Sequence, residues 1–289
     1  MFVETMAGIA ASVVVLGLIV EGLARRGVSL PRLLDPPGES AVRRLGRLGD
    51  ERPVFVVVTA AVATVLFVYP FVDAVMRAAG TAPPFGYWDF SAYTTALNRW
   101  LAGESMYVTN DAGGYFGTYL YPPFFVLVIW PFSELFEFGR AARLWQVFSV
   151  LFLWLSLQPV SRALGHTLRV WERGLLLWLL VGFHPLLFSV KQGQISAFLA
   201  ALISLSLYGL LRGRESAPGG RLSRYASGAC TALVGTTKLV YGAVGTHLLA
   251  DRDRFAGAVA GALVVGAISL AVFGVDAHLG YYDVLRWGK

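Results

Sequence analysis

Residues 86–124 read GYWDFSAYTTALNRWLAGESMYVTNDAGGYFGTYLYPPF, the longest aromatic and polar interruption in an otherwise apolar chain. Asp89 lies within an aromatic frame, Trp88-Asp89-Phe90. We expect a short helix after it, because the Asp89 side chain can accept a backbone N–H two or three residues later as an N-cap. Gly103 is well placed to end that helix. We interpret the stretch as a loop with short interfacial helices, held on a membrane surface by the rest of the chain.

The remainder of the 289-residue chain is strongly apolar, with 56% hydrophobic residues and a mean hydropathy of +0.61. Soluble domains contain about 45–50% apolar residues even when glycine is counted. The composition therefore predicts an all-α integral membrane protein, with residues 1–289 forming a single polytopic helical bundle. The net charge of +6 is attributed to arginines in cytoplasmic loops, and no nucleic-acid partner is expected.

Charge asymmetry indicates how the chain is oriented in the membrane. A first apolar run, 6–23, is followed by a basic loop, 25–52, that carries seven arginines. Arginine-rich loops favour the cytoplasmic side, so residues 25–52 are expected to be cytoplasmic. The next run, 54–76, then leads outward, and residues 79–124 form an extracytoplasmic loop.

Later apolar runs leave two arrangements open. These runs are 119–138, 145–160, 175–190, 195–211, 226–250 and 255–275. If all of them span, the basic loops 162–173 and 212–224 lie outside, against the usual bias. We prefer an arrangement in which 119–138 stays on the outer surface and 226–250 is a broken or re-entrant helix that bends near Lys238.

Two ionisable residues are the main candidates for chemistry. Asp89 is an acidic side chain among aromatic ones such as Tyr93, which suit a stacked sugar or lipid head group; a helix cap within an interfacial aromatic belt is the plainer alternative. Lys238 interrupts an apolar run, and an ionisable residue in that setting indicates a functional site. It could hold a phosphate as a point charge, or reach toward the membrane surface from a helix end.

Weaker candidates remain open between a structural and a functional role. The tight turn Lys191-Gln-Gly-Gln194 offers amide side chains, but it could simply connect two helices. Arg140 and Arg143 either set the topology or face a phosphate. The sequence contains no Walker, HExxH or GxGxxG signature, and no ligand cluster demands a metal.

The order of several motifs resembles that of the GT-C membrane glycosyltransferases, and most closely glycosyltransferase family 87, the polyprenyl-phosphate-mannose-dependent mannosyltransferases. The residues that carry the resemblance are DFSAY at 89–93, LAGESMY at 101–107, YPPF at 121–124, Gly193-Gln194 and Lys238. Two positions depart from the family pattern, since Ser196 stands where asparagine is common and Leu239 where proline is common.

The resemblance implies an inverting hexosyl transfer, with mannose as the expected sugar, from a polyprenyl phosphate to a glycan or glycolipid acceptor. Asp89 would be the general base, and Gln194 and Lys238 would line the lipid-phosphate side. A phosphate leaving group needs a nearby cation, and for that role Arg143 is a weaker candidate than Lys238. Tyr93 and Tyr121 would contact the substrate. No cofactor is implied, and a divalent metal has no support in the sequence.

The resemblance also implies a location and a possible partner. It favours a multi-pass protein of the plasma membrane with an extracytoplasmic active face, in which 79–124 is the catalytic loop. Family members continue for further membrane helices, so the chain would correspond to a shortened member whose remaining helices could come from a partner chain. The alternative functions are a non-catalytic lipid-binding subunit and a membrane transporter.

Overall fold

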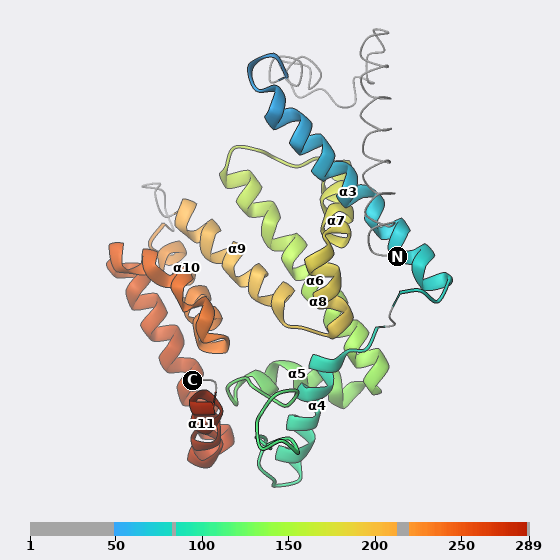
Figure 1. Ribbon diagram of the computed structural model, residues 1–289. Helices are drawn as coiled ribbons and strands as arrows, with labels where there is room; N and C mark the ends of the chain where they lie inside the picture. Colours follow the sequence, from blue (N-terminus) through green and yellow to red (C-terminus); the bar gives the residue numbers. More distant parts are fainter. Residues whose placement is uncertain (1–48, 83–84, 213–219, 288–289) are drawn as a thin grey trace. The chain divides into compact units, whose positions relative to one another are not determined.

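The computed structural model describes residues 49–82, 85–212 and 220–287, and all regular structure in these ranges is helical (Figure 1). The elements are α3 (Pro53–Ala78), α4 (Trp88–Leu101), α5 (Phe125–Leu135), α6 (Phe138–Ala163), α7 (Val170–Gly182), α8 (His184–Gln192), α9 (Ser196–Arg212), α10 (Gly220–Thr237), the 3₁₀-helix η2 (Leu239–Ala250) and α11 (Arg252–Trp287). The expected all-α architecture is confirmed. The expected first span, 6–23, and most of the basic loop 25–52 lie outside the described residues.

Three of the described helices, α3, α6 and α11, are long and apolar enough to cross a membrane. A fourth candidate is the pair α7 and α8, which is bent by 67° between Gly182 and His184. Pro185 explains why one straight helix does not continue here, because proline lacks the N–H that would bond to the carbonyl four residues earlier. The chain is therefore a polytopic membrane protein, while the side of the membrane on which each loop lies stays a prediction.

Two apolar runs of the sequence do not form simple spans. The run 119–138 contains α5, which has only 11 residues, whereas about 20 are needed to cross a bilayer. The run 226–250 is divided at Lys238, whose backbone is extended (φ −142°, ψ 99°) between the end of α10 and the start of η2. This break leaves the Lys238 side chain at a helix junction.

The last apolar run continues further than the sequence indicates. We expected an apolar run over 255–275, but the helix α11 continues beyond it to Trp287. A kink separates the two parts at Gly274, whose φ of 70° is a conformation that glycine adopts without steric cost. His278 bridges the kink, with Nδ1 2.7 Å from the Gly274 carbonyl oxygen and Nε2 2.9 Å from Ser269 Oγ.

The described residues form two compact units. The first contains α3 and residues 177–187. Within it, Trp178 Nε1 donates a hydrogen bond to the Phe67 carbonyl at 3.0 Å. Gly182 lies so close to Leu66 that a Cβ atom would overlap the Leu66 main-chain oxygen. Close backbone packing therefore joins the parts of this unit.

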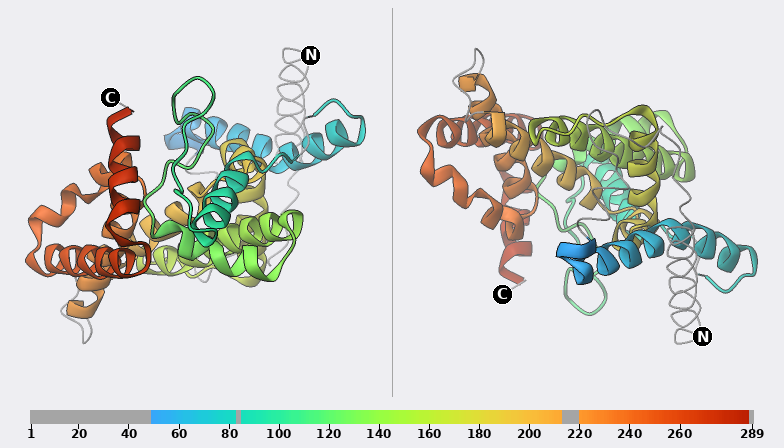
Figure 2. Two further views of the ribbon diagram at one scale, coloured as in Figure 1. Left: turned by 90° about the horizontal axis from the view of Figure 1, so that it is seen from below. Right: turned by 90° about the horizontal axis from the view of Figure 1, so that it is seen from above.

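The second unit, 84–176 and 188–289, contains the first part of α7, the last part of α8, and all of α4, α5, α6, α9, α10, η2 and α11. In it α10 packs against both α9 and α11, and α6 packs against α9 (Figure 2). Its core is rich in buried aromatic rings, including Phe90, Tyr93, Tyr119, Phe125 and Trp145. Aromatic rings prefer the tilted and edge-to-face contacts that these residues make. The interruption around 86–124 thus contributes several buried residues to the core, among them Phe90, Tyr93 and Tyr119, instead of lying loosely on the surface.

Close contact between α10 and α11 depends on small residues and leads to the first prediction. A Cβ atom at Gly228 of α10 would overlap the Arg254 main-chain oxygen, so Gly228→Ala must push the helices apart. Overpacking of this kind costs about 1–3 kcal/mol, and the melting temperature of the detergent-solubilised protein should fall. Gly266→Ala in α11 is the matched control, because no atom lies within 4 Å of its Cβ position. Equal melting temperatures for the two variants would contradict this packing.

Candidate active site

The position of Asp89 depends on how α4 begins. Tyr87 precedes the helix in a left-handed conformation (φ 50°, ψ 35°), and no side chain caps the helix. The expectation that Asp89 is the N-cap is therefore wrong. The reason is a backbone contact: Tyr87 N–H donates to the Lys191 carbonyl at 3.0 Å, which fixes the start of the helix at Trp88. Asp89 then lies in the first turn with its side chain available to the cavity described below.

The end of α4 agrees with the sequence prediction. Gly103 adopts a φ of 76°, and its N–H donates to the Trp100 carbonyl at 2.9 Å. Glu104 N–H donates to the Arg99 carbonyl at 2.8 Å. This pair of bonds is the Schellman arrangement, in which glycine closes a helix C-terminus.

The turn after α8 ends in the same way and carries Gln194. Gly193 has a φ of 78°, its N–H donates to Val190 at 3.1 Å, and Gln194 N–H donates to Ser189 at 2.9 Å. A Cβ atom at Gly193 would lie 2.7 Å from the Cβ of Phe90 in α4. Only glycine therefore allows this turn to approach α4, and the approach brings Gln194 beside Asp89.

Hydrogen bonds orient the amide of Gln194. Its Oε1 accepts bonds from Ser189 Oγ and Ser196 Oγ, both at 3.3 Å. The amide lies beside the carboxylate of Asp89, whose pKa it lowers as a hydrogen-bond donor. The Gln194 main-chain carbonyl accepts a further bond from Gln146 Nε2 at 3.3 Å.

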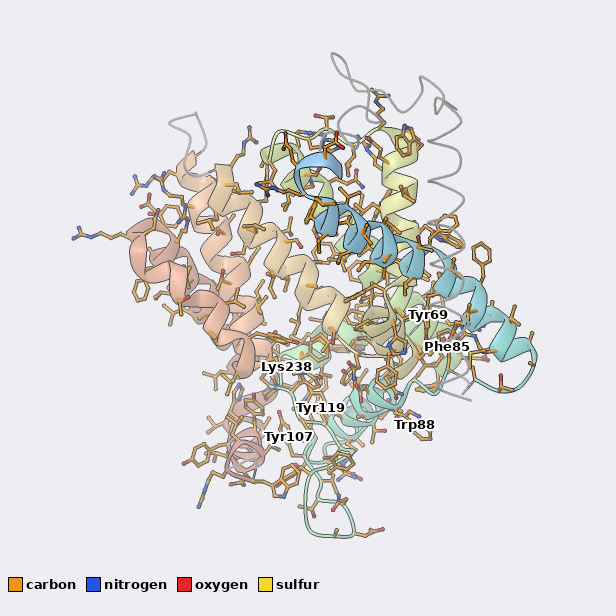
Figure 3. The ribbon with its side chains drawn as sticks, turned by 45° about the horizontal axis from the view of Figure 1, so that its top comes forward. Tyr69, Phe85, Trp88, Tyr107, Tyr119 and Lys238 are labelled. Carbon is orange, nitrogen blue, oxygen red and sulfur yellow. The ribbon has the colours of Figure 1, made fainter. Side chains whose placement is uncertain are left out.

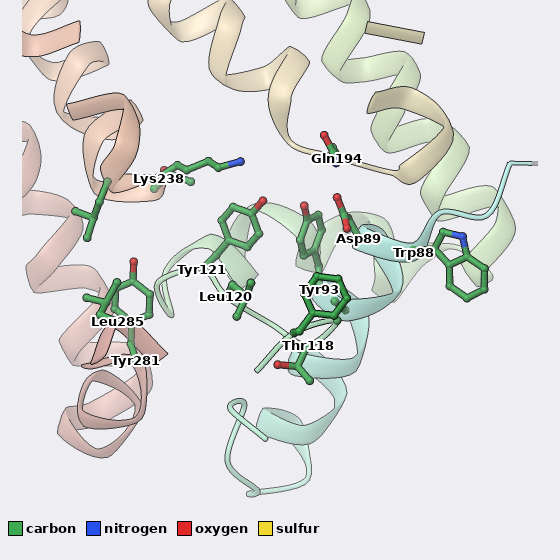
Figure 4. Close-up of a pocket in the computed structure, with 15 residues that line it drawn as sticks. Trp88, Asp89, Tyr93, Thr118, Leu120, Tyr121, Gln194, Lys238, Tyr281 and Leu285 are labelled. Carbon is green, nitrogen blue, oxygen red and sulfur yellow. The ribbon is translucent and has the colours of Figure 1, made fainter. Parts of the chain in front are cut away.

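These residues border a cavity of about 400 Å³ in the second unit (Figure 4). Its lining residues are Trp88, Asp89, Ala92, Tyr93, Phe116, Gly117, Thr118, Leu120, Tyr121, Gln194, Thr237, Lys238, Leu239, Tyr281 and Leu285. Asp89 and Lys238 project into it from opposite sides, with Tyr121 between them. Trp88 turns away from Asp89. The cavity thus offers a carboxylate and an ammonium group to one bound molecule.

The environment of Asp89 perturbs its carboxyl group in two directions. Burial raises the pKa of Asp89 above its ordinary value of 3.8, because the low-dielectric surroundings disfavour the charged form. The hydrogen bond from Gln194 and the positive charge of Lys238 oppose this rise. A carboxylate with a raised pKa is a stronger base than an ordinary carboxylate, which suits it to accept a proton.

Two tyrosines, Tyr93 and Tyr121, lie near the carboxylate of Asp89. Tyr93 is 1% exposed, and its ring meets the ring of Tyr121 edge-on at 5.3 Å. Burial raises the pKa of both phenols, so both stay protonated. Tyr107 Oη donates to the Tyr121 carbonyl and Tyr119 Oη donates to the Pro122 carbonyl, each at 2.8 Å. Figure 3 shows Tyr107 and Tyr119 in the segment between α4 and α5, which they tie into the core.

Five of the six residues singled out from the sequence line the cavity: Asp89, Tyr93, Tyr121, Gln194 and Lys238. Their roles toward a substrate stay predictions. Arg143 does not line it. That residue is exposed on α6, where its Nε donates to the carbonyl of Gly139 at 3.0 Å.

Sequence reasoning missed the contribution of the C-terminal segment. Tyr281 and Leu285 line the cavity from the part of α11 beyond Gly274. Their spacing of four residues would have indicated one helical face, had the segment been recognised as a helix. Among the described residues, no three His, Cys, Asp or Glu side chains gather as a metal site would require.

Comparison with known proteins agrees with this architecture. The model of glycosyltransferase family 87 matches residues 119–288, more than half of the 289-residue chain. The matched segment includes Tyr121, Gln194 and Lys238, whereas Asp89 precedes it. No curated protein and no solved structure gives a significant match. The chain belongs to glycosyltransferase family 87 and is a membrane glycosyltransferase.

Proposed function

We propose that the protein transfers a hexose, with mannose as the leading candidate, from a polyprenyl phosphate to a glycan or glycolipid acceptor. The observation that carries the proposal is the cavity in which Asp89, held by Gln194, lies opposite Lys238. A base and a cation on opposite sides of one cavity match the two charges that change during this reaction. The active face is proposed to be extracytoplasmic, at the plasma membrane.

The leaving group explains the need for a cation. Breaking the bond between the anomeric carbon and the phosphate oxygen leaves a polyprenyl phosphate that carries one more negative charge. A phosphate leaves without being protonated, so a second carboxylic acid of the kind used in glycoside hydrolysis is unnecessary. The ammonium group of Lys238 would stabilise the developing charge. Leu120, Leu239 and Leu285 line the same cavity and offer apolar surface to the first isoprene units.

The acceptor explains the need for a base. Its hydroxyl oxygen forms the new bond to the anomeric carbon, and its proton passes to the carboxylate of Asp89. Attack on the face opposite to the departing phosphate inverts the anomeric configuration. The Tyr93 and Tyr121 hydroxyls, protonated and close to Asp89, are proposed to contact the sugar.

Removing the base tests the proposal most directly. Asp89→Asn keeps the size of the side chain but cannot accept the proton, and transfer should fall by about 100-fold or more. Transfer of radiolabelled mannose from a polyprenyl-phosphate donor, with membranes that contain the chain, measures the loss. Asp111→Asn is the matched control, because Asp111 is exposed and does not line the cavity. Full activity of Asp89→Asn would refute the assignment of the base.

The same assay separates the proposal from its main alternative. A wild-type chain that binds the lipid-linked sugar but transfers none of it would be a non-catalytic lipid-binding subunit. A chain that moves the lipid across a vesicle membrane without transferring the sugar would be a transporter.

Replacing the cation should weaken the stabilisation of the leaving group. Lys238→Met removes the charge from the cavity, and transfer should fall by about 100-fold, the scale seen when one stabilising donor is lost. Lys238→Arg retains the charge and should retain more activity than Lys238→Met. Arg143→Met removes a positive charge from outside the cavity lining and should leave transfer unchanged. A larger loss for Arg143→Met than for Lys238→Met would reverse the two assignments.

The pH dependence should report the ionisation of Asp89. Because the base must be ionised, kcat/KM falls as the pH drops through its pKa, which burial raises. Gln194→Leu removes the hydrogen bond that lowers this pKa, so the pKa rises further and the acid limb moves to higher pH. Activity at alkaline pH should approach that of the wild type. An acid limb that stays in place or moves to lower pH would show that Gln194 does not stabilise the carboxylate.

A further inference from the structure

We propose that Ser189 and Ser196 are positioning residues that hold the Gln194 amide with its N–H group toward Asp89, an inference that rests on the proposed role of Asp89. The two hydroxyls come from opposite sides of the turn, Ser189 from the last turn of α8 and Ser196 from the first residue of α9. Both donate to the same atom, Gln194 Oε1, at 3.3 Å.

An amide side chain has one oxygen that accepts hydrogen bonds and one nitrogen that donates them. Without the two hydroxyls, the Gln194 amide could rotate and place Oε1 against the carboxylate of Asp89. Two acceptors would then face each other, and the carboxylate would lose the bond that favours its charged form. The hydroxyls oppose this rotation because they occupy Oε1 on the side away from Asp89.

Other contacts fix the main chain of the turn and leave only the side chain to be oriented. Gln146 donates to the Gln194 carbonyl at 3.3 Å, and Gly193 packs against Phe90. Ser189 is 4% exposed, so its hydroxyl has no ready access to bulk water. We therefore expect the serines to act on Asp89 through the orientation of the amide.

The test measures the pKa of Asp89 in the purified full-length protein. Infrared titration follows the band of the protonated carboxyl group, which is identified by its absence in Asp89→Asn. Ser189→Ala and Ser196→Ala should each raise the pKa, and the double variant should raise it more than either, up to the value in Gln194→Leu. Ser189→Thr and Ser196→Thr keep the hydroxyl and should stay closer to the wild type.

Two comparisons distinguish positioning from a general structural effect. Ser204→Ala in α9 is the matched control, because the Ser204 hydroxyl bonds to the Ala200 carbonyl at 2.8 Å and should leave the pKa unchanged. In a Gln194→Leu background, removing the two serine hydroxyls should cause no further shift, because the amide through which they act is gone. The inference would be overturned if removing the serine hydroxyls shifted the pKa of Asp89 equally in the wild-type and Gln194→Leu backgrounds. It would also be overturned if the pKa shifted in neither background.

The infrared readout does not depend on turnover, so the inference and the proposed function can fail separately. If the serine variants raise the pKa and move the acid limb of transfer by the same amount, both stand. If the serine variants raise the pKa of Asp89 but Asp89→Asn leaves transfer unchanged, the positioning role is supported and the assignment of Asp89 as the base is refuted. If Asp89→Asn abolishes transfer but the serine variants leave the pKa of Asp89 unchanged, only the positioning role of the serines is refuted.

Discussion

The contact between the start of α4 and the end of α8 is the constraint on which the rest of the site depends. Helix ends leave backbone groups without partners within the helix. Here the Tyr87 N–H before α4 satisfies the Lys191 carbonyl in the last turn of α8. Tyr87 adopts a left-handed conformation to do so, which is uncommon for a residue other than glycine and is frequent at functional sites. Gly193 lets the two backbones meet, and the acid and its amide partner are thereby brought together from distant parts of the sequence.

The cavity balances opposing effects on one carboxyl group. Burial alone would favour the protonated form of Asp89, which could not accept a proton from the acceptor. Full exposure would leave an ordinary carboxylate, which is a weak base. The hydrogen bond from Gln194 and the charge of Lys238 offset part of the burial. Lys238 therefore serves the proposed reaction twice, by keeping the base ionised and by stabilising the departing phosphate.

Local signals in the sequence predicted the local features of the fold. The apolar runs predicted the long helices, and Gly103 predicted the end of α4. The N-cap assignment of Asp89 failed because the group that fixes the start of α4 is a carbonyl about one hundred residues further along the chain. No local pattern reveals such a partner.

The same holds for the candidate site: individual residues could be chosen from the sequence, but which of them meet in the cavity depends on contacts between distant segments. The resemblance to the family drew attention to Asp89, Gln194 and Lys238, and the structure places all three around one cavity. Arg143 was a candidate because its charge could face a phosphate, but its exposed side chain on α6 does not line the cavity. Sequence reasoning did not identify Tyr281 and Leu285 as cavity residues. Their segment follows the last apolar run, and its sequence does not reveal that the helix continues beyond the kink at Gly274.

The geometry of the cavity follows from two backbone contacts that the sequence marks only by glycines. One side is fixed where Gly193 meets α4, and the other where Gly228 of α10 meets α11. Because α10 ends at Thr237, the position of that helix determines where Lys238 lies, and the packing of α9 against both α6 and α10 connects the two sides. A site built from preset helix contacts needs little rearrangement when substrate binds, which is the condition under which electrostatic stabilisation is most effective. The separation of Asp89 and Lys238 is thus a property of helix packing, and a substrate of the proposed reaction would have to match it.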